Sequence, residues 1–283
     1  MAPEATSLTV DTGLISLAAE EVGEGPTIVA AHGLTASRSY VVHGSNALAR
    51  RDHRLVTYDA RGHGSSDPAP AGSGYGYEAL EADLEAVIDE HAADGLPVLA
   101  GHSMGAHTLL RFALSAPDRV AGIVVIGPAW DGSEPDADAL ADWDAMSSGL
   151  RSEGIDGFVE AWRAQGIDDE WEDRLETIVR RRLGEHDHLD AVADALAEVP
   201  RSAPFGELSE LEDLDVPVLV VASHDEADPS HPYELAERYA DLLPQGRLVS
   251  EDEGDSPLAW QGGKLSREIA SFCQTEAVRD RLG

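Results

Sequence analysis

The sequence predicts an α/β fold: a mostly parallel sheet of the eight-stranded type, with helices on both faces and an inserted helical cap. Three observations favour this fold class. Short apolar runs alternate with helical segments, a long acidic stretch interrupts the alternation, and a glycine-flanked serine joins a strand to a helix. Continuous apolarity within each run is typical of strands buried on both faces, as in a parallel sheet covered by helices.

The chain begins with a predicted hairpin. Two strand-like runs, Leu8 to Val10 and Leu14 to Ala19, are separated by Asp11-Thr12-Gly13, which is a turn signal. Later apolar runs predict strands at residues 27–31, 54–58, 97–100, 120–126, 216–222 and 246–250. Apolar residues at helical spacing predict helices at residues 77–91, 106–115, 233–243 and 258–272.

An acidic, helical stretch between about Asp131 and Glu212 interrupts this alternation. Trp143, Trp162 and Trp171 within it indicate that part of the stretch packs on an apolar surface. We therefore expect a core made of residues 1–130 and 211–283, with a cap at 131–210 between them. Such a cap roofs a pocket at the carboxyl edge of the sheet.

The charge of the chain is strongly acidic. Its 54 acidic and 20 basic residues give a net charge of −34, and Lys264 is the only lysine. Such a surface repels nucleic acid and anionic membranes, so neither is an expected partner. The bias predicts a halophilic source, because concentrated salt shortens the Debye length to about 3 Å and screens the repulsion. An acidic protein from an ordinary cell is the alternative.

The sequence also limits location and covalent chemistry. Residues 1–7 hold neither a basic region nor an apolar run, and no stretch approaches the roughly 18 apolar residues of a membrane span. We therefore expect a cytoplasmic, soluble protein. The single cysteine, Cys273, excludes an intramolecular disulfide and a thiol cluster for zinc.

One run of residues has the composition of a metal site. His186-Asp187-His188-Leu189-Asp190 contains imidazoles and carboxylates that could ligate zinc. The run lies in a predicted helical, charge-rich segment, where side chains two residues apart point to different faces. We expect a solvated helix there, and no metal or other cofactor.

The strongest chemical signal is Gly101-His102-Ser103-Met104-Gly105, which follows an apolar strand and precedes an apolar helix. In this position the pattern predicts a strained turn that exposes the Ser103 hydroxyl as a nucleophile. The Met104 N–H would face a developing oxyanion, and the Leu34 N–H, after His32-Gly33, would complete the oxyanion hole. His107, one turn into the helix, is expected to be packed.

Four motifs in order resemble the α/β-hydrolase superfamily across nearly the whole chain. They are His32-Gly33, the run from Asp59 to Ser66, the run from Gly101 to Gly105, and the loop from Ser223 to Pro229. The resemblance implies hydrolysis of an ester, lactone, thioester, amide or C–C bond. It also implies that Arg61 and His63 are framework residues. Dehalogenases and epoxide hydrolases of this superfamily carry Asp at the elbow, so Ser103 argues against their chemistry.

The resemblance implies an acidic triad residue in the loop after the strand at 216–222. Asp225 stands four residues before Pro229, as the family pattern requires. Asp228 is the second candidate and Glu226 the third.

The family also requires a histidine after the last strand, and here the sequence departs from the pattern. The loop has Gly254-Asp255 where Gly-His is expected, and no histidine follows His231. Asp255 therefore occupies the slot of the base, although a carboxylate with a reference pKa near 4 is a weak base at neutral pH. His224 and His231 stay open as substitutes.

The sequence thus predicts a serine hydrolase that acts on a small ester, lactone or related acyl substrate through Ser103, with an atypical or impaired triad. Its partner would be a small molecule, and nothing in the sequence indicates an oligomeric state. The alternative is a non-catalytic protein of the same fold that binds a ligand or a partner, because a fold does not determine a function.

Overall fold

The computed structural model describes residues 4–92, 95–165, 169–224, 228–251 and 260–282. Within them, one eight-stranded sheet has the order β1-β2-β4-β3-β5-β6-β7-β8. The pairs β1/β2 and β2/β4 are antiparallel, and the other neighbours are parallel. The strands are β1 Thr6–Asp11, β2 Ser16–Val22, β3 Thr27–Ala31, β4 Arg54–Tyr58, β5 Val98–His102, β6 Gly122–Ile126, β7 Val218–Val221 and β8 Gly246–Val249.

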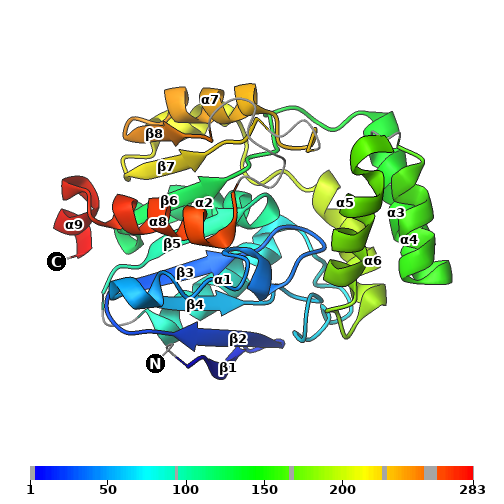
Figure 1. Ribbon diagram of the computed structural model, residues 1–283, viewed down its shortest axis with the longest axis horizontal. Coiled ribbons are helices and arrows are strands. Elements are labelled where there is room, and N and C mark those ends of the chain that lie inside the picture. The colour runs from blue at the N-terminus through cyan, green and yellow to red at the C-terminus, as the bar shows by residue number, and fades with distance from the viewer. Residues whose placement is uncertain (1–3, 93–94, 166–168, 225–227, 252–259, 283) are drawn as a thin grey trace.

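The predicted fold class is confirmed, and helices cover both faces of the sheet (Figure 1). The core helices are α1 Tyr77–His91, α2 Met104–Ser115, α7 Tyr233–Leu242, α8 Gly262–Cys273 and α9 Glu276–Leu282. Short 3-10 turns lie at η1 Arg38–Tyr40, η2 Ala49–Arg51, η3 Pro117–Arg119, η4 Val199–Arg201 and η5 Leu208–Asp213.

Adjacent residues of the central strands are buried on opposite faces. Val29 belongs to an apolar cluster that includes residues of α1, α2 and α7, whereas Ile28 and Ala30 belong to a second cluster with residues of α8. This double burial is the physical reason for the continuous apolar runs in the sequence.

The N-terminal hairpin forms, but its second strand begins later than predicted. The two strands pair from Thr6 with Glu21 to Asp11 with Ser16. The Ile15 N–H donates to Oγ1 of Thr12 at 3.1 Å, so the turn extends past Gly13. Leu14, predicted as strand, is 68% exposed within this turn. The Thr12 side chain accepts a backbone hydrogen bond within the turn, so β2 begins only at Ser16.

Four helices lie between β6 and β7 and form what is called the cap below (residues 137–198; Figure 1). They are α3 Ala137–Glu153, α4 Ile155–Arg163, α5 Asp169–Leu183 and α6 Leu189–Glu198. The cap has its own apolar cluster, against which Trp143, Trp162 and the core residue Leu34 pack. The side chain of Trp171 lies outside the described part of the chain. Among the described helices, none is both long and apolar enough to cross a membrane.

Candidate active site

Ser103 lies on the turn between β5 and α2 with φ of 51° and ψ of −116°. A positive φ is unusual for a residue with a Cβ and costs on the order of 1–3 kcal/mol. Two backbone hydrogen bonds hold the turn: Ser103 N–H donates to Ile126 O at 3.0 Å, and His107 N–H donates to Ser103 O at 3.1 Å. Within the described chain, Oγ of Ser103 has no hydrogen bond to a protein group, so the hydroxyl is free to react.

The glycines beside Ser103 are needed for space. A Cβ on Gly105 would lie 2.3 Å from Ala31 O, and a Cβ on Gly101 would lie 2.6 Å from Ala106 N. Both distances are shorter than any real contact of a Cβ. Gly105 therefore lets the turn approach the end of β3, and Gly101 lets the end of β5 approach the start of α2.

The loop after β3 lies directly against this turn. A Cβ on Gly33 would lie 2.8 Å from Nδ1 of His102 and 3.3 Å from Cβ of Ser103. Thr35 adopts φ of 64°, which reverses the chain after Leu34. This left-handed conformation is rare for a β-branched residue. Gly33 and Thr35 together bring the Leu34 backbone close to the turn that carries Ser103.

Two backbone amides near Ser103 are without protein acceptors. Across the residues that the structure describes, neither the Leu34 N–H nor the Met104 N–H donates to a protein group. Met104 is the first residue of α2, where helix amides point outward and the helix dipole favours negative charge. These amides have the chemistry of an oxyanion hole.

Three buried histidine rings form a cluster beside this loop: the His63 ring is tilted against His32 and edge-on to His186, with ring centroids 5.2 and 5.5 Å away. His32 accepts a hydrogen bond from Ala60 N–H at Nε2 and donates from Nδ1 to Gly33 O. With one nitrogen accepting and one donating, the ring is neutral, and burial lowers the pKa of His32 to about 4. His32 thus positions the Gly33 carbonyl and is not a free base.

The run at His186 to Asp190 was predicted as a solvated helix, and that prediction is wrong for residues 186–188, which are not helical. Helix α6 begins only at Leu189, and His186 lies buried in the preceding turn. Its two ring nitrogens are occupied by backbone groups of the core, Gly64 N–H and Thr35 O. In the described part of the chain, no cluster of histidine, cysteine and acidic residues could hold a metal ion.

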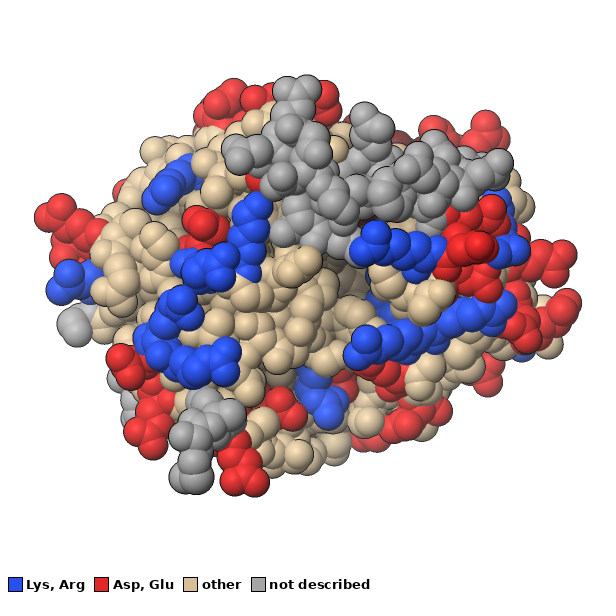
Figure 2. Space-filling model, in the orientation of Figure 1, with Lys and Arg blue, Asp and Glu red and all other residues tan. Residues whose placement is uncertain are grey.

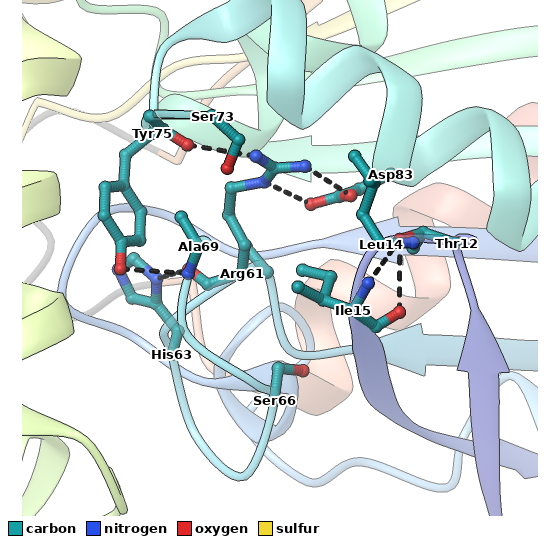
Figure 3. Close-up of polar contacts among 12 residues, drawn as sticks. Thr12, Leu14, Ile15, Arg61, His63, Ser66, Ala69, Ser73, Tyr75 and Asp83 are labelled. Carbon is teal, nitrogen blue, oxygen red and sulfur yellow. Dashed lines mark hydrogen bonds and ion pairs between the residues drawn. The ribbon is translucent and has the colours of Figure 1, made fainter. Parts of the chain in front are cut away.

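Arg61 and His63 lie in the loop after β4 (Figure 3). Arg61 donates from Nε and Nη2 to the Asp83 carboxylate at 2.7 and 2.8 Å, and both side chains are buried. His63 donates from Nδ1 to Arg61 O at 3.0 Å. The ion pair joins the loop to α1, which suits the framework role expected of both residues.

The loop after β7 brings together two of the candidates. Nδ1 of His231 donates to Oδ2 of Asp228 at 2.8 Å. The His231 ring lies 4.9 Å from the ring of His102, the residue before Ser103. His224 instead stacks on Tyr233, with centroids 4.0 Å apart and planes inclined by 19°. The remaining sequence candidates, Asp225, Glu226 and Asp255, lie outside the described residues.

Sequence reasoning missed Arg182, in the last turn of α5. Its Nε is buried without a hydrogen-bond partner, and its guanidinium makes no ion pair with a described residue. Burial is the main reason that the pKa of His102 falls to about 3, but the Arg182 charge contributes, as it does to the lowered pKa of His32. Among the described residues, Arg182 is therefore a cation without an ion-pair partner near the turn that carries Ser103.

A second buried donor lies near Arg182. The Tyr40 hydroxyl, on η1 beside the loop after β3, makes no hydrogen bond of normal geometry with a described residue, although the Glu185 carboxylate lies close to it. Burial and the Glu185 charge raise the pKa of Tyr40, and the nearby Arg181 and Arg182 charges oppose that rise. In Figure 2, basic side chains border the hollow between the core and the cap. The run Arg180-Arg181-Arg182, in a chain so poor in basic residues, was the available sequence signal.

The eight-stranded sheet, the helical insertion after β6 and the strained serine turn after β5 define a protein of the α/β-hydrolase class. Residues 26–261 match the family model described as alpha/beta hydrolase fold, and the chain belongs to that family.

The chain is similar to characterised hydrolases. It is 30% identical over 209 residues to 2-hydroxy-6-oxononadienedioate/2-hydroxy-6-oxononatrienedioate hydrolase 2 of Pseudomonas putida, which covers 71% of this chain and 72% of the relative. It is 36% identical over 120 residues to 2-(acetamidomethylene)succinate hydrolase of Mesorhizobium japonicum, or 41% of each chain. A thermophilic esterase from Thermogutta terrifontis shares the fold, with a TM-score of 0.73 and 22% identity over 98% of this chain and all of that one. The protein is thus a hydrolase of the α/β-hydrolase fold, related in sequence to the two hydrolases named above.

Proposed function

We propose that this protein hydrolyses a small ester, lactone or related acyl substrate through Ser103. The observation that supports this most is the conformation of Ser103, with φ of 51°, on a turn held by neighbouring glycines and backbone hydrogen bonds. A strained backbone conformation of this kind persists only where the surrounding structure imposes it. Such conformations are concentrated at functional sites. Here this conformation presents a hydroxyl and two nearby amides, those of Leu34 and Met104, that have no hydrogen-bond partner among the described residues.

The reaction follows from these groups. Oγ of Ser103 attacks the acyl carbon, and the carbonyl electron pair moves onto oxygen. The Leu34 and Met104 amides then hydrogen-bond that oxyanion. Loss of one such donor typically costs about 10²- to 10³-fold in turnover. Collapse of the tetrahedral intermediate breaks the bond to the leaving group, and water hydrolyses the acyl-enzyme by the same route.

Arg182 supports an assignment of the substrate class. Its buried Nε has no hydrogen-bond partner among the described residues, and it fits a ligand that supplies negatively charged oxygen. The chain has 54 acidic residues, yet none that the structure describes forms an ion pair with Arg182. We therefore propose that the substrate carries a carboxylate. The two enzymes above are named for dicarboxylic substrates, which supports this assignment.

Turnover of short p-nitrophenyl esters by the parent protein and by Ser103→Ala tests the proposal. We expect turnover by the parent and none above background by the variant, with the same melting temperature. Turnover that survives in the variant would show that Ser103 is not the nucleophile. A parent protein that turns over none of these esters or a carboxylate-bearing series would favour the non-catalytic alternative.

A further inference from the structure

We propose that His231, oriented by Asp228, is the general base for Ser103. In this arrangement the loop after β7 supplies both the acid and the base of the triad, and the loop after β8 need not supply a histidine. The inference rests on the proposed function, because it names the base of that same reaction.

His231 lies beside the turn that carries Ser103. A Cβ placed on Gly127 would lie 3.2 Å from Cγ of His231 and 3.4 Å from Nε2 of His102. Gly127 directly follows Ile126, whose carbonyl accepts the hydrogen bond from Ser103 N–H. The imidazole therefore packs on the strand end that anchors the nucleophile turn.

The hydrogen bond to Asp228 fixes the tautomer of His231. A carboxylate can only accept, so Nδ1 of His231 carries the proton and Nε2 has a free lone pair. Within the described chain, Nε2 has no protein partner, and the side chain is 15% exposed. A proton acceptor with an orienting carboxylate behind it is the arrangement that a general base needs.

The charge state of Asp228 suits this role. Burial alone would raise the pKa of Asp228, but the hydrogen bond and charge of His231, with His102 and Arg182 nearby, hold it below its usual value. Asp228 is therefore ionised at neutral pH. An ionised partner stabilises the imidazolium that forms when Ser103 loses its proton.

The other histidines near the turn are poorer bases. Burial lowers the pKa of His102 and of His107 to about 3 in each case. Nε2 of His107 also accepts hydrogen bonds from Ala129 N–H and Trp130 N–H, both at 3.2 Å. His224 is stacked on Tyr233. Of the described histidines around Ser103, His231 combines an orienting carboxylate with an unoccupied nitrogen.

His231 can accept and return each proton that the reaction transfers. As Oγ of Ser103 bonds to the acyl carbon, its proton passes to Nε2 of His231. The imidazolium then gives that proton to the leaving oxygen as the acyl bond breaks. In deacylation, His231 takes a proton from water and returns one to Ser103. Ser103 and His231 form no hydrogen bond in this structure, and contacts of this kind commonly close only in the substrate complex.

The test is p-nitrophenyl acetate turnover by Ser103→Ala, His231→Gln, His231→Ala, Asp228→Asn and Asp255→Asn. His188→Gln, an exposed histidine in the turn before α6, is the matched control. Thermal melts show whether each variant is folded. We expect His231→Gln to lose about 10²- to 10⁴-fold in kcat, the contribution of a positioned base, and His188→Gln to keep parental turnover.

Two further readouts separate a base from a structural residue. Added imidazole should restore part of the turnover of His231→Ala, because it replaces the missing proton acceptor. Asp228→Asn should lower turnover while the variant stays folded.

The outcomes distinguish this inference from the proposed function. If Ser103→Ala stays active, the proposed function fails and the base assignment fails with it. If Ser103→Ala is silent while folded His231→Gln keeps parental turnover, only the base assignment is overturned. In that case, silence of Asp255→Asn would place the base in the loop after β8.

Discussion

The Gly64 amide of the core donates a hydrogen bond to Nδ1 of the cap residue His186 at 2.7 Å. On its other side, His186 donates from Nε2 to Thr35 O at 2.9 Å. One imidazole of the cap therefore ties the loop after β4 to the loop after β3, which carries Leu34. The cap thus supports the loop that carries Leu34 as well as covering the carboxyl edge of the sheet.

Replacement of His186 should therefore lower both stability and turnover. In His186→Ala, Gly64 N–H and Thr35 O lose their partners, and each unsatisfied buried group costs about 1–3 kcal/mol. We expect a loss of roughly 2–5 kcal/mol in the free energy of unfolding, measured by urea denaturation. The exposed neighbour His188 should tolerate the same change within about 0.5 kcal/mol. Equal losses in the free energy of unfolding of the two variants would show that His186 does not hold the two loops together.

Stability should also depend on pH through the buried histidines. Burial lowers the pKa of His32 to about 4 and the pKa of His186 below its usual value. An unfolded imidazole titrates near 6.5, so between about pH 6.5 and 4 the unfolded chain binds protons that the folded chain does not. The free energy of unfolding should be highest above that range and fall as the pH drops through it.

The expected size for His32 alone is roughly 3 kcal/mol, because each pKa unit corresponds to about 1.4 kcal/mol. Urea denaturation between about pH 7.5 and 5, in about 1 M salt, should capture roughly 2 kcal/mol of this effect with the surface charges screened. A free energy of unfolding that stays flat across this range would contradict the neutral, hydrogen-bonded histidines described here.

Arg182 should decide substrate preference. Arg182→Gln removes a charge-assisted hydrogen bond worth about 1.5–3 kcal/mol, so kcat/KM for a carboxylate-bearing ester should fall by about 10- to 100-fold. An uncharged ester of similar size should change little. Arg181→Gln, an exposed arginine in the same helical turn, is the control. Equal losses on both esters would mean that Arg182 serves the structure and not the substrate.

Salt should stabilise the folded protein. A net charge of −34 repels itself most strongly in dilute buffer, and molar salt shortens the Debye length to about 3 Å. Thermal melts should therefore rise by several degrees between dilute buffer and about 1 M chloride. A melting temperature that does not change would remove the charge argument for a halophilic source.

The parts of the molecule that the sequence predicted well depend on local chemistry. Helix α1 covers the predicted residues 77–91, because its apolar residues recur at helical spacing. The serine turn at residues 101–105 was recognisable because the strand, the two glycines and the helix adjoin one another. In both cases, residues close in the sequence impose the structure.

Features that depend on distant packing were not predictable in this way. His186 contacts Gly64, which lies 122 positions earlier in the chain. Arg182 is informative only because no acidic residue that the structure describes forms an ion pair with it. His231 and Asp228 were both candidates, but their pairing depends on the turn in which His231 N–H donates to Asp228 O at 3.2 Å. Such relationships arise from the folded chain and have no signature in the local pattern.

Ser103 is the proposed nucleophile, and its hydroxyl should react with reagents selective for activated serines. Mass spectrometry after incubation with a fluorophosphonate, which phosphonylates activated serines, tests it most directly. We predict one added phosphonyl group on the intact protein, located by peptide mapping on Ser103, and no addition to folded Ser103→Ala. Addition at another residue, or equal addition to Ser103→Ala, would contradict the account.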